Sequence, residues 1–144
     1  MSQTDKPTAL AEYTGAIRFQ MHWGEMDAFG HLNNTIYFRY FESARIVFFE
    51  TLDITERGMP RAIGPILGYT SCRFKAPLTF PDTLWAATRV TDIQDDRFTV
   101  EHVVYSEKLE RIAAVGEATI VAYDYRNNTK ATLPDSWRDC LENC

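Results

Sequence analysis

The sequence predicts a single α+β domain of 144 residues. It contains one alternating segment near its start, one long apolar segment after it, and then four extended segments in succession. Strands that follow one another directly favour an antiparallel sheet, whereas regular strand–helix alternation would favour a parallel one. The long segment is apolar on nearly every side and therefore has to be enclosed by other structure. We expect a curved, five-stranded antiparallel sheet to wrap around one long central helix.

The first strand and the helix are predicted from their hydrophobic periods. Residues 16–23 (AIRFQMHW) alternate apolar and polar side chains, which is typical of a half-buried strand. Residues 35–52 (TIYFRYFESARIVFFETL) carry apolar residues at helical spacing. Asn33 or Asn34 can cap this helix, because either side chain can accept a hydrogen bond from a free amide of the first turn. The main apolar stripe consists of Tyr37, Tyr40, Phe41, Ala44 and Phe48.

The remaining elements are four strands and a short terminal helix. Strands are predicted over residues 66–77, 83–93, 98–107 and 112–124, separated by charged or turn-forming residues. A short helix is predicted within residues 134–144, with Asp135 near its cap. Residues 1 to about 13 show no such pattern and are expected to form a loose lead-in. The whole chain, residues 1–144, is expected to be one domain.

Composition excludes several classes of function. The formal net charge is -5 and no run of basic residues occurs, so we expect no nucleic-acid partner. No apolar run approaches the roughly 18 residues needed to span a bilayer, and no signal peptide is recognisable, so we expect no membrane partner. The cysteines lack metal-binding spacing and are odd in number, which favours a reducing, cytoplasmic location. They are Cys72, Cys140 and Cys144.

The polar segment GEMDAFGHLNN, residues 24–34, connects the first strand to the helix. The free amides at a helix N-terminus form a ready site for negative charge. The carboxylate of Asp27 precedes those amides and is ionised at neutral pH, so it can act as a general base or as a nucleophile. Gly30 can adopt a positive φ, as a tight loop requires. The segment therefore brings a carboxylate and a site for negative charge close together in the sequence.

The motif D-x-x-G-H-x-N-N before such a helix resembles that of the hotdog-fold thioesterases of the 4-hydroxybenzoyl-CoA thioesterase type. The similarity extends from about residue 17 to residue 134 and includes the segments YFESAR (40–45) and RFKAPLTFPDTL (73–84). In the motif and the helix it rests on Asp27, Gly30, His31, Asn33, Asn34 and Tyr37.

This resemblance implies an acyl-CoA thioesterase that forms a homodimer or a homotetramer, with sheets side by side and active sites between subunits. The essential carboxylate of the family falls on Asp27, and the amide that polarises the thioester carbonyl falls on or next to Asn34. Gly30, His31, Asn33 and Tyr37 are the further substrate-binding candidates. No cofactor and no metal are implied. Aryl specificity does not carry over, because this loop has His31, Asn33 and Asn34 where aryl-specific members often carry aromatic residues.

Alternatives remain at the level of the activity. Asp27 can serve as general base or as nucleophile, and it can also be a simple turn residue. A hotdog hydratase or dehydratase and a non-catalytic acyl-CoA-binding sensor are the rival functions. A metal site built from His22, Glu25, Asp27 and His31 is disfavoured, since their spacing matches no known ligand pattern.

Structural roles are expected for several other polar residues. Glu25 is expected to be solvated, Glu42 and Arg45 to form an ion pair on the helix, and His102 to be half-buried in a strand. Tyr37 is expected to be a core residue first and a lining of the acyl cleft second. The candidates for binding the phosphates of coenzyme A are Arg61, Arg73, Lys75, Arg89 and Arg97.

Overall fold

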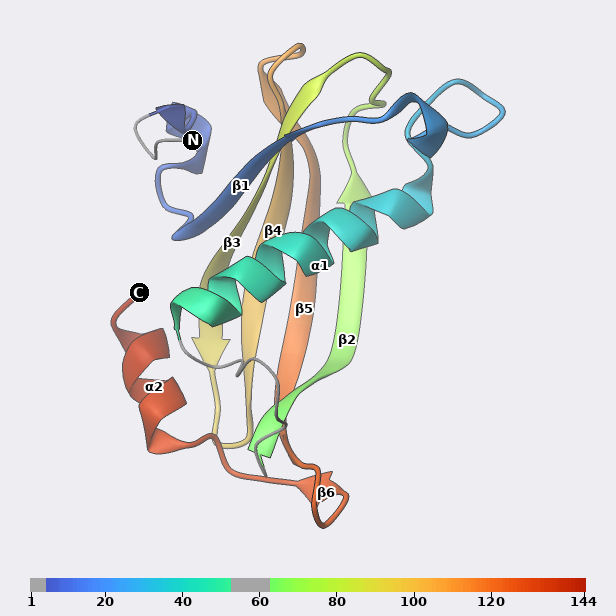
Figure 1. Ribbon diagram of the computed structural model, residues 1–144. Coiled ribbons are helices and arrows are strands. Elements are labelled where there is room, and N and C mark those ends of the chain that lie inside the picture. Colours follow the sequence, from blue (N-terminus) through green and yellow to red (C-terminus); the bar gives the residue numbers. More distant parts are fainter. Residues whose placement is uncertain (1–4, 53–62) are drawn as a thin grey trace.

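A computed structural model describes residues 5–52 and 63–144 and shows a curved antiparallel sheet around one long helix, α1 (Asn34–Thr51) (Figure 1). The spatial order of the five long strands is β1-β3-β4-β5-β2, and every neighbouring pair is antiparallel. The α+β fold class is confirmed. The strands are β1 (Gly15–Gln20), β2 (Ile63–Phe74), β3 (Thr83–Ile93), β4 (Arg97–Ser106) and β5 (Arg111–Asp124), with a short β6 (Thr129–Lys130) that pairs with β5.

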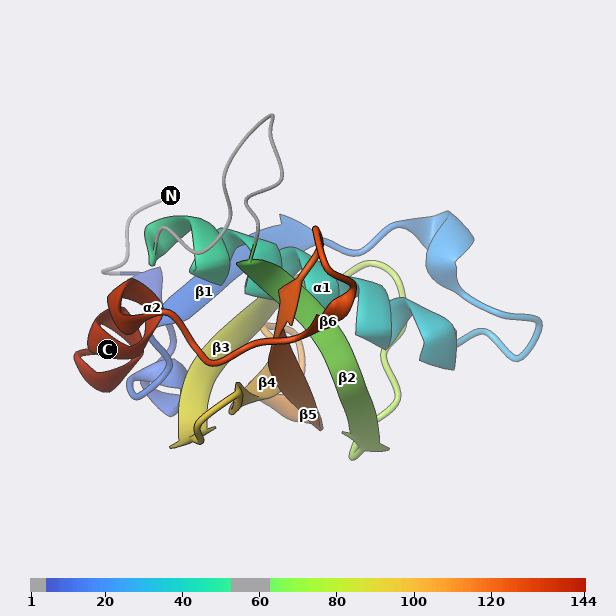
Figure 2. The same ribbon diagram turned by 90° about the horizontal axis from the view of Figure 1, so that it is seen from below.

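Helix α1 lies on the concave side of the sheet (Figure 2). Phe41 and Phe48 point from it into two adjoining clusters of buried side chains and are almost completely buried. Its other face is open in the single chain, where Ile46 and Val47 are 43% and 38% exposed. The prediction of a helix enclosed on nearly all sides is therefore wrong for one chain, since the sheet covers only one face.

Glycine 116 in β5 allows α1 to lie close to the sheet. A Cβ atom at this position would collide with the ring of Phe41 and would lie 2.6 Å from the carbonyl oxygen of Ser71. Such contacts are too short for real side chains, and a packed interior has no space to relieve them. Any other residue at position 116 would therefore displace Phe41.

Within residues 5–13, the described part of the predicted lead-in, the chain is folded rather than loose. Residues 8–10 form a 3-10 helix, and both Leu10 and Tyr13 are buried against the outer face of the sheet. They pack with Trp85, Ala87 and Val103. The alternation of β3 and β4 places these apolar side chains on the face away from α1. The N-terminal segment covers them.

At the other end of the chain, α2 (Asp135–Glu142) provides the short helix expected there, with Asp135 in its first turn. Trp137 and Leu141 of α2 are buried in the cluster that contains Phe98. Neither helix of the described residues is long and apolar enough to cross a membrane.

Among the residues that the structure describes, strand β2 forms one edge of the sheet and pairs only with β5. Its side chains are more exposed than those of the inner strands, and Leu67 and Tyr69 are 45% and 57% exposed. A long edge strand with apolar side chains presents unpaired backbone groups that can pair with another strand.

Candidate active site

The segment between β1 and α1 folds into a narrow hairpin at the start of the helix. After a short 3-10 turn at residues 23–25, Met26 and Leu32 form an isolated antiparallel bridge. The amide of Asp27 donates to the carbonyl of His31 (2.8 Å), and the amide of Gly30 donates to the carbonyl of Asp27 (3.0 Å). Gly30 has a φ of +79°, as its place in a tight loop predicts. The hairpin therefore carries Asp27, Gly30 and His31 together.

Asp27 is exposed and combines a turn role with an accessible carboxylate. Its Oδ1 accepts a hydrogen bond from the amide of Phe29 at 2.9 Å, which is the side-chain turn typical of aspartate. Within the residues that the structure describes, Oδ2 has no hydrogen-bond partner. One carboxylate oxygen thus orients the side chain, and the other is available for chemistry.

Asn33 caps α1. Its Oδ1 accepts hydrogen bonds from the amide and the hydroxyl of Thr35, both at 2.9 Å. Asn34 is the first helical residue and is exposed, and its amide has no partner within the described ranges 5–52 and 63–144. The sequence left Asn33 and Asn34 open as alternative caps. The structure assigns the capping role to Asn33. The backbone N–H of Asn34 has no hydrogen-bond partner among the described residues.

His31 and Tyr37 differ in their exposure. His31 is exposed in the hairpin, whereas Tyr37 is only 3% exposed, one turn into α1. The ring of Tyr37 packs edge to face on Phe74 of β2 at 4.9 Å between centroids. Burial raises the pKa of Tyr37 to about 12, so its hydroxyl is protonated at neutral pH. The core role expected for Tyr37 is the one that the structure shows.

Glu25 is not the solvated side chain that the sequence suggests. It is partly buried, and its Oε1 accepts hydrogen bonds from the amide of His22 and from the hydroxyl of Tyr40, both at 2.8 Å. The sequence placed it on a continuing strand, but η3 (Trp23–Glu25) turns the chain and brings the side chain toward α1.

Two exposed aromatic residues near Asp27 in the sequence are not among the site residues that the sequence predicts. Phe29 and Trp23 are 87% and 71% exposed, so both rings are available to a substrate or a partner. Phe29 lies within the motif itself, which means that this loop does carry an aromatic residue. The sequence signal for this aromatic residue was available in DAFG, residues 27–30.

Arg45 and His102 form a buried pair. The sequence predicts instead an ion pair between Glu42 and Arg45 and a half-buried His102. Arg45 is 7% exposed, His102 is completely buried, and Arg45 Nη1 lies 3.1 Å from His102 Nε2. No ion pair joins Arg45 to Glu42 in the part of the chain that the structure describes. A guanidinium only donates, so Nε2 accepts and Nδ1 carries the hydrogen that bonds Thr88 Oγ1 at 3.0 Å. Burial, reinforced by the charge of Arg45, lowers the pKa of His102 to about 3.

The candidate phosphate-binding cations are scattered. Arg89 and Arg97 are ion-paired with acidic side chains at 3.0 and 2.8 Å. Arg73 and Lys75 line a surface cavity of about 410 Å³ that also has acidic walls. Arg61 lies outside the described residues. No cluster of His, Cys, Asp or Glu side chains that could hold a metal ion occurs over residues 5–52 and 63–144.

A curved antiparallel sheet around one long helix defines the class of hotdog-fold proteins. The chain belongs to the Thioesterase-like superfamily, whose model matches residues 21–141. It is similar to a provisionally named esterase of Aquifex aeolicus, with 26% identity over 131 residues that cover 87% of this chain and 95% of the relative.

Solved structures agree with this membership. A provisionally assigned thioesterase from Pseudomonas aeruginosa has a TM-score of 0.79 and 28% identity, over 90% of this chain and 98% of that one. A 1,4-dihydroxy-2-naphthoyl-CoA thioesterase from Synechocystis has a TM-score of 0.77 and 16% identity, over 90% and 96% of the two chains. At that identity the second likeness shows the fold alone.

Proposed function

We propose that this protein hydrolyses an acyl-CoA thioester to a free acid and coenzyme A. The observation that carries the proposal is the exposed Asp27 carboxylate, with Oδ2 free among the described residues, in the hairpin that leads into α1, where the backbone amide of Asn34 has no partner in the same residues. Hydrolysis needs an activated oxygen nucleophile and a donor for the charge that develops on the carbonyl oxygen. Membership of the Thioesterase-like superfamily supports hydrolysis of a thioester.

Two routes use the same groups. In the first, Asp27 removes a proton from water, the water oxygen attacks the thioester carbon, and the carbon–sulfur bond breaks as Asp27 returns the proton to the departing thiolate. In the second, the carboxylate attacks directly and expels the thiolate, and water then hydrolyses the resulting anhydride. In both routes the Asn34 amide donates to the carbonyl oxygen, aided by the positive end of the α1 dipole.

The test is thiol release from short-chain, long-chain and aryl acyl-CoAs by wild type and by Asp27→Asn, which keeps the shape and removes the charge. We expect wild type to turn over at least one class and Asp27→Asn to lose about 100-fold or more in kcat, the range typical of one acid–base group. Equal rates for both proteins would remove Asp27 from the chemistry. Acyl-CoA binding without thiol release would favour the sensor, and hydration of an enoyl thioester would favour the hydratase.

A single turnover in heavy-oxygen water separates the two routes. A general base places the heavy oxygen directly in the product acid. A nucleophilic Asp27 acquires heavy oxygen itself when water attacks its own carbonyl, and mass spectrometry of the peptide that contains Asp27 detects this label.

We further propose that the active form is a homodimer in which a second copy pairs with the free edge of β2. The exposed Leu67 and Tyr69 on this edge, together with Ile46 and Val47 on the open face of α1, support a partner of the same chain. A two-fold axis makes such a contact self-complementary. The N-terminal segment covers the outer face at Trp85, Ala87 and Val103, so that part of the sheet is not available to a partner.

A further inference from the structure

Glu25 connects three parts of the molecule that surround the Asp27 hairpin. Its side-chain Oε1 accepts from the amide of His22, at the end of the segment that follows β1, and from the hydroxyl of Tyr40 on α1. Its own carbonyl oxygen accepts from the amide of Asn33, the helix cap, at 3.0 Å. One residue therefore bonds to the incoming chain, to the cap and to the helix body.

Tyr40 is a rigid partner for this contact. Its side chain is 7% exposed, and its ring packs on Phe19 of β1 with centroids 4.6 Å apart. Burial and the bond to Glu25 both raise the pKa of Tyr40, so the hydroxyl remains a donor. A partly buried carboxylate is costly unless it is hydrogen-bonded, and the two donors on Oε1 meet that requirement.

The geometry resists rotation of the hairpin relative to the helix. Glu25 and Asn33 face each other at the base of the hairpin, so the loop that carries Asp27 extends from this pair. Asn33 is the helix cap and Tyr40 lies in the body of α1, so the two hydrogen bonds join Glu25 to different turns of the helix. Two bonds from separate atoms of Glu25, its carbonyl oxygen and its Oε1, restrict rotation more than the Asn33 contact alone.

We propose that Glu25 and Tyr40 are positioning residues, whose hydrogen bond holds the Asp27 hairpin in register with the free amide of Asn34. The proposal rests on the proposed thioesterase function. Neither residue is assigned a step in the chemistry, because both donors on Oε1 come from the protein itself. A small displacement of a reacting group is enough to slow an enzyme substantially, so the loss of this bond has a measurable cost.

The first test is Tyr40→Phe, which removes one hydroxyl and keeps the ring on Phe19. We expect kcat to fall by roughly 10-fold or more while KM stays within about twofold, because misplacement affects the reacting groups more than substrate binding. Backbone amide exchange at Asp27, Gly30 and Asn33 should accelerate at the same time. The matched control is Tyr125→Phe, which removes a hydroxyl that donates to the carbonyl of Pro65 on the surface, and which should change neither kcat nor these exchange rates.

The second test separates positioning from catalysis at Glu25. Glu25→Gln keeps an acceptor oxygen for both donors and should retain most of the activity and the slow exchange, whereas Glu25→Ala should resemble or exceed Tyr40→Phe. If Glu25→Gln loses as much activity as Asp27→Asn, the charge of Glu25 takes part in the chemistry and the positioning role is wrong.

Amide exchange does not depend on substrate, so the two proposals fail in different ways. A wild-type protein that releases no thiol from any acyl-CoA, combined with faster hairpin exchange in Tyr40→Phe, would reject the thioesterase and keep the anchored hairpin. An active wild type with unchanged kcat and unchanged exchange in Tyr40→Phe would reject the positioning role alone.

Discussion

Single residues in this protein acquire their roles from one or two hydrogen bonds. Asp27 is a turn residue through Oδ1 and a candidate base or nucleophile through Oδ2, so the two interpretations of the sequence describe different oxygens of one side chain. Asn33 uses its side chain to cap α1, which leaves the amide of the next residue accessible. At this scale the identity of an atom, rather than of a residue, decides between structure and chemistry.

Gly30 is expected to resist substitution for backbone reasons alone. Gly30→Ala should lower the free energy of unfolding by about 1–2 kcal/mol, because the φ of +79° is unfavourable for a residue with a Cβ, although that Cβ would have open space around it. Denaturant unfolding measures the change. Gly24→Ala is the matched control, since Gly24 also has open space but no positive φ, and should leave stability unchanged. Equal effects of the two substitutions would contradict the explanation.

His102 makes the fold sensitive to acid. Its pKa is lowered from 6.5 to about 3 by burial and by Arg45, so below pH 6.5 the unfolded chain binds a proton that the folded chain does not. The contribution of His102 to stability is therefore complete above pH 6.5 and is lost as the pH falls from 6.5 toward 3, at up to about 1.4 kcal/mol per pH unit.

Unfolding free energies measured between pH 7 and pH 4 check this dependence on pH. His102→Gln keeps an acceptor for Arg45 but does not titrate, so its stability should decline less steeply than that of wild type over this range. The carboxylates that titrate in the same range are common to both proteins and cancel in the comparison. Parallel slopes would show that His102 is protonated in the folded state.

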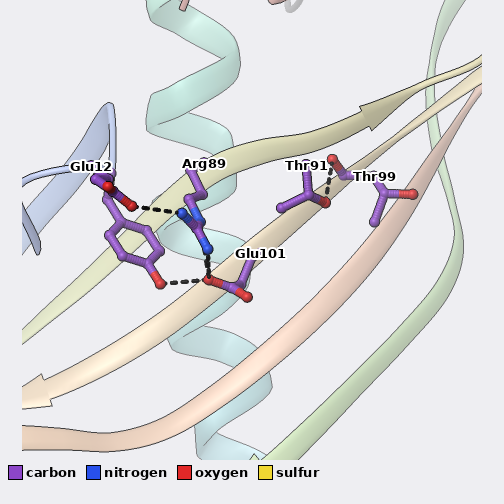
Figure 3. Close-up of polar contacts among 6 residues, drawn as sticks. Glu12, Arg89, Thr91, Thr99 and Glu101 are labelled. Atoms are coloured by element: carbon purple, nitrogen blue, oxygen red, sulfur yellow. Dashed lines mark hydrogen bonds and ion pairs between the residues drawn. The ribbon is translucent and has the colours of Figure 1, made fainter.

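At the scale of elements, the N-terminal segment acts as a cover for the outer face of the sheet. Figure 3 shows its Glu12 beside Arg89 of β3, which in turn contacts Glu101 of β4. The Glu12 contact is exposed and contributes little, whereas the buried Leu10 and Tyr13 remove apolar surface from water. The hydroxyl of Tyr13 also donates to Glu101 at 2.5 Å, and burial together with this bond raises the pKa of Tyr13 to about 12.

The cover can be tested by Leu10→Ala. Truncation of a completely buried leucine should lower the free energy of unfolding by about 2–5 kcal/mol if the segment is an integral part of the fold. Leu109→Ala serves as the control, because Leu109 is 41% exposed and its truncation should cost well under 1 kcal/mol. A negligible effect of Leu10→Ala would restore the loose lead-in.

At the scale of the whole molecule, the single chain has two incompletely covered apolar surfaces. The edge of β2 and the open face of α1 expose aliphatic and aromatic side chains, while the outer face of the sheet is covered by the N-terminal segment at Trp85, Ala87 and Val103. Tyr37, buried at the start of α1, packs on Phe74 of β2 and so connects the helix start to this strand. A partner on β2 would therefore lie near the residues proposed to bind substrate.

The double substitution Leu67→Lys and Tyr69→Lys should convert a dimer into monomers and reduce thiol release, since lysine on a strand edge opposes pairing. Sedimentation velocity measures the mass, and circular dichroism verifies that the monomer is folded. Leu109→Lys, in the turn after β4, is the surface control and should leave the dimer intact. Sedimentation of the wild type as a monomer at micromolar concentration would contradict the proposed interface.

Local patterns were sufficient for much of this architecture. The periods of two and of 3.6 residues depend only on near neighbours, so the sequence alone predicts the fold class, the strands along the chain and a helix at residues 35–52 that is observed at Asn34–Thr51. Four strands in succession suggest a meander, but the observed sheet places β2 beside β5 and not beside β3. The tight loop around Gly30 and the choice of Asn33 or Asn34 as cap are likewise local. The strand predicted over residues 66–77 is observed as β2 at Ile63–Phe74.

Contacts between distant residues required the tertiary structure. Glu25 and Tyr40 are 15 residues apart, so no local pattern distinguishes their hydrogen bond from solvation of Glu25. Arg45 and His102 are 57 residues apart, so no local pattern distinguishes their contact from an ion pair of Arg45 with Glu42, three residues before it. The cover formed by Leu10 and Tyr13 depends on which face of β3 and β4 the alternation leaves apolar and open. Periodicity determines which side of an element is buried, but only the packed chain decides which partner buries it, because that choice is made by shape and by hydrogen-bond satisfaction across the whole molecule.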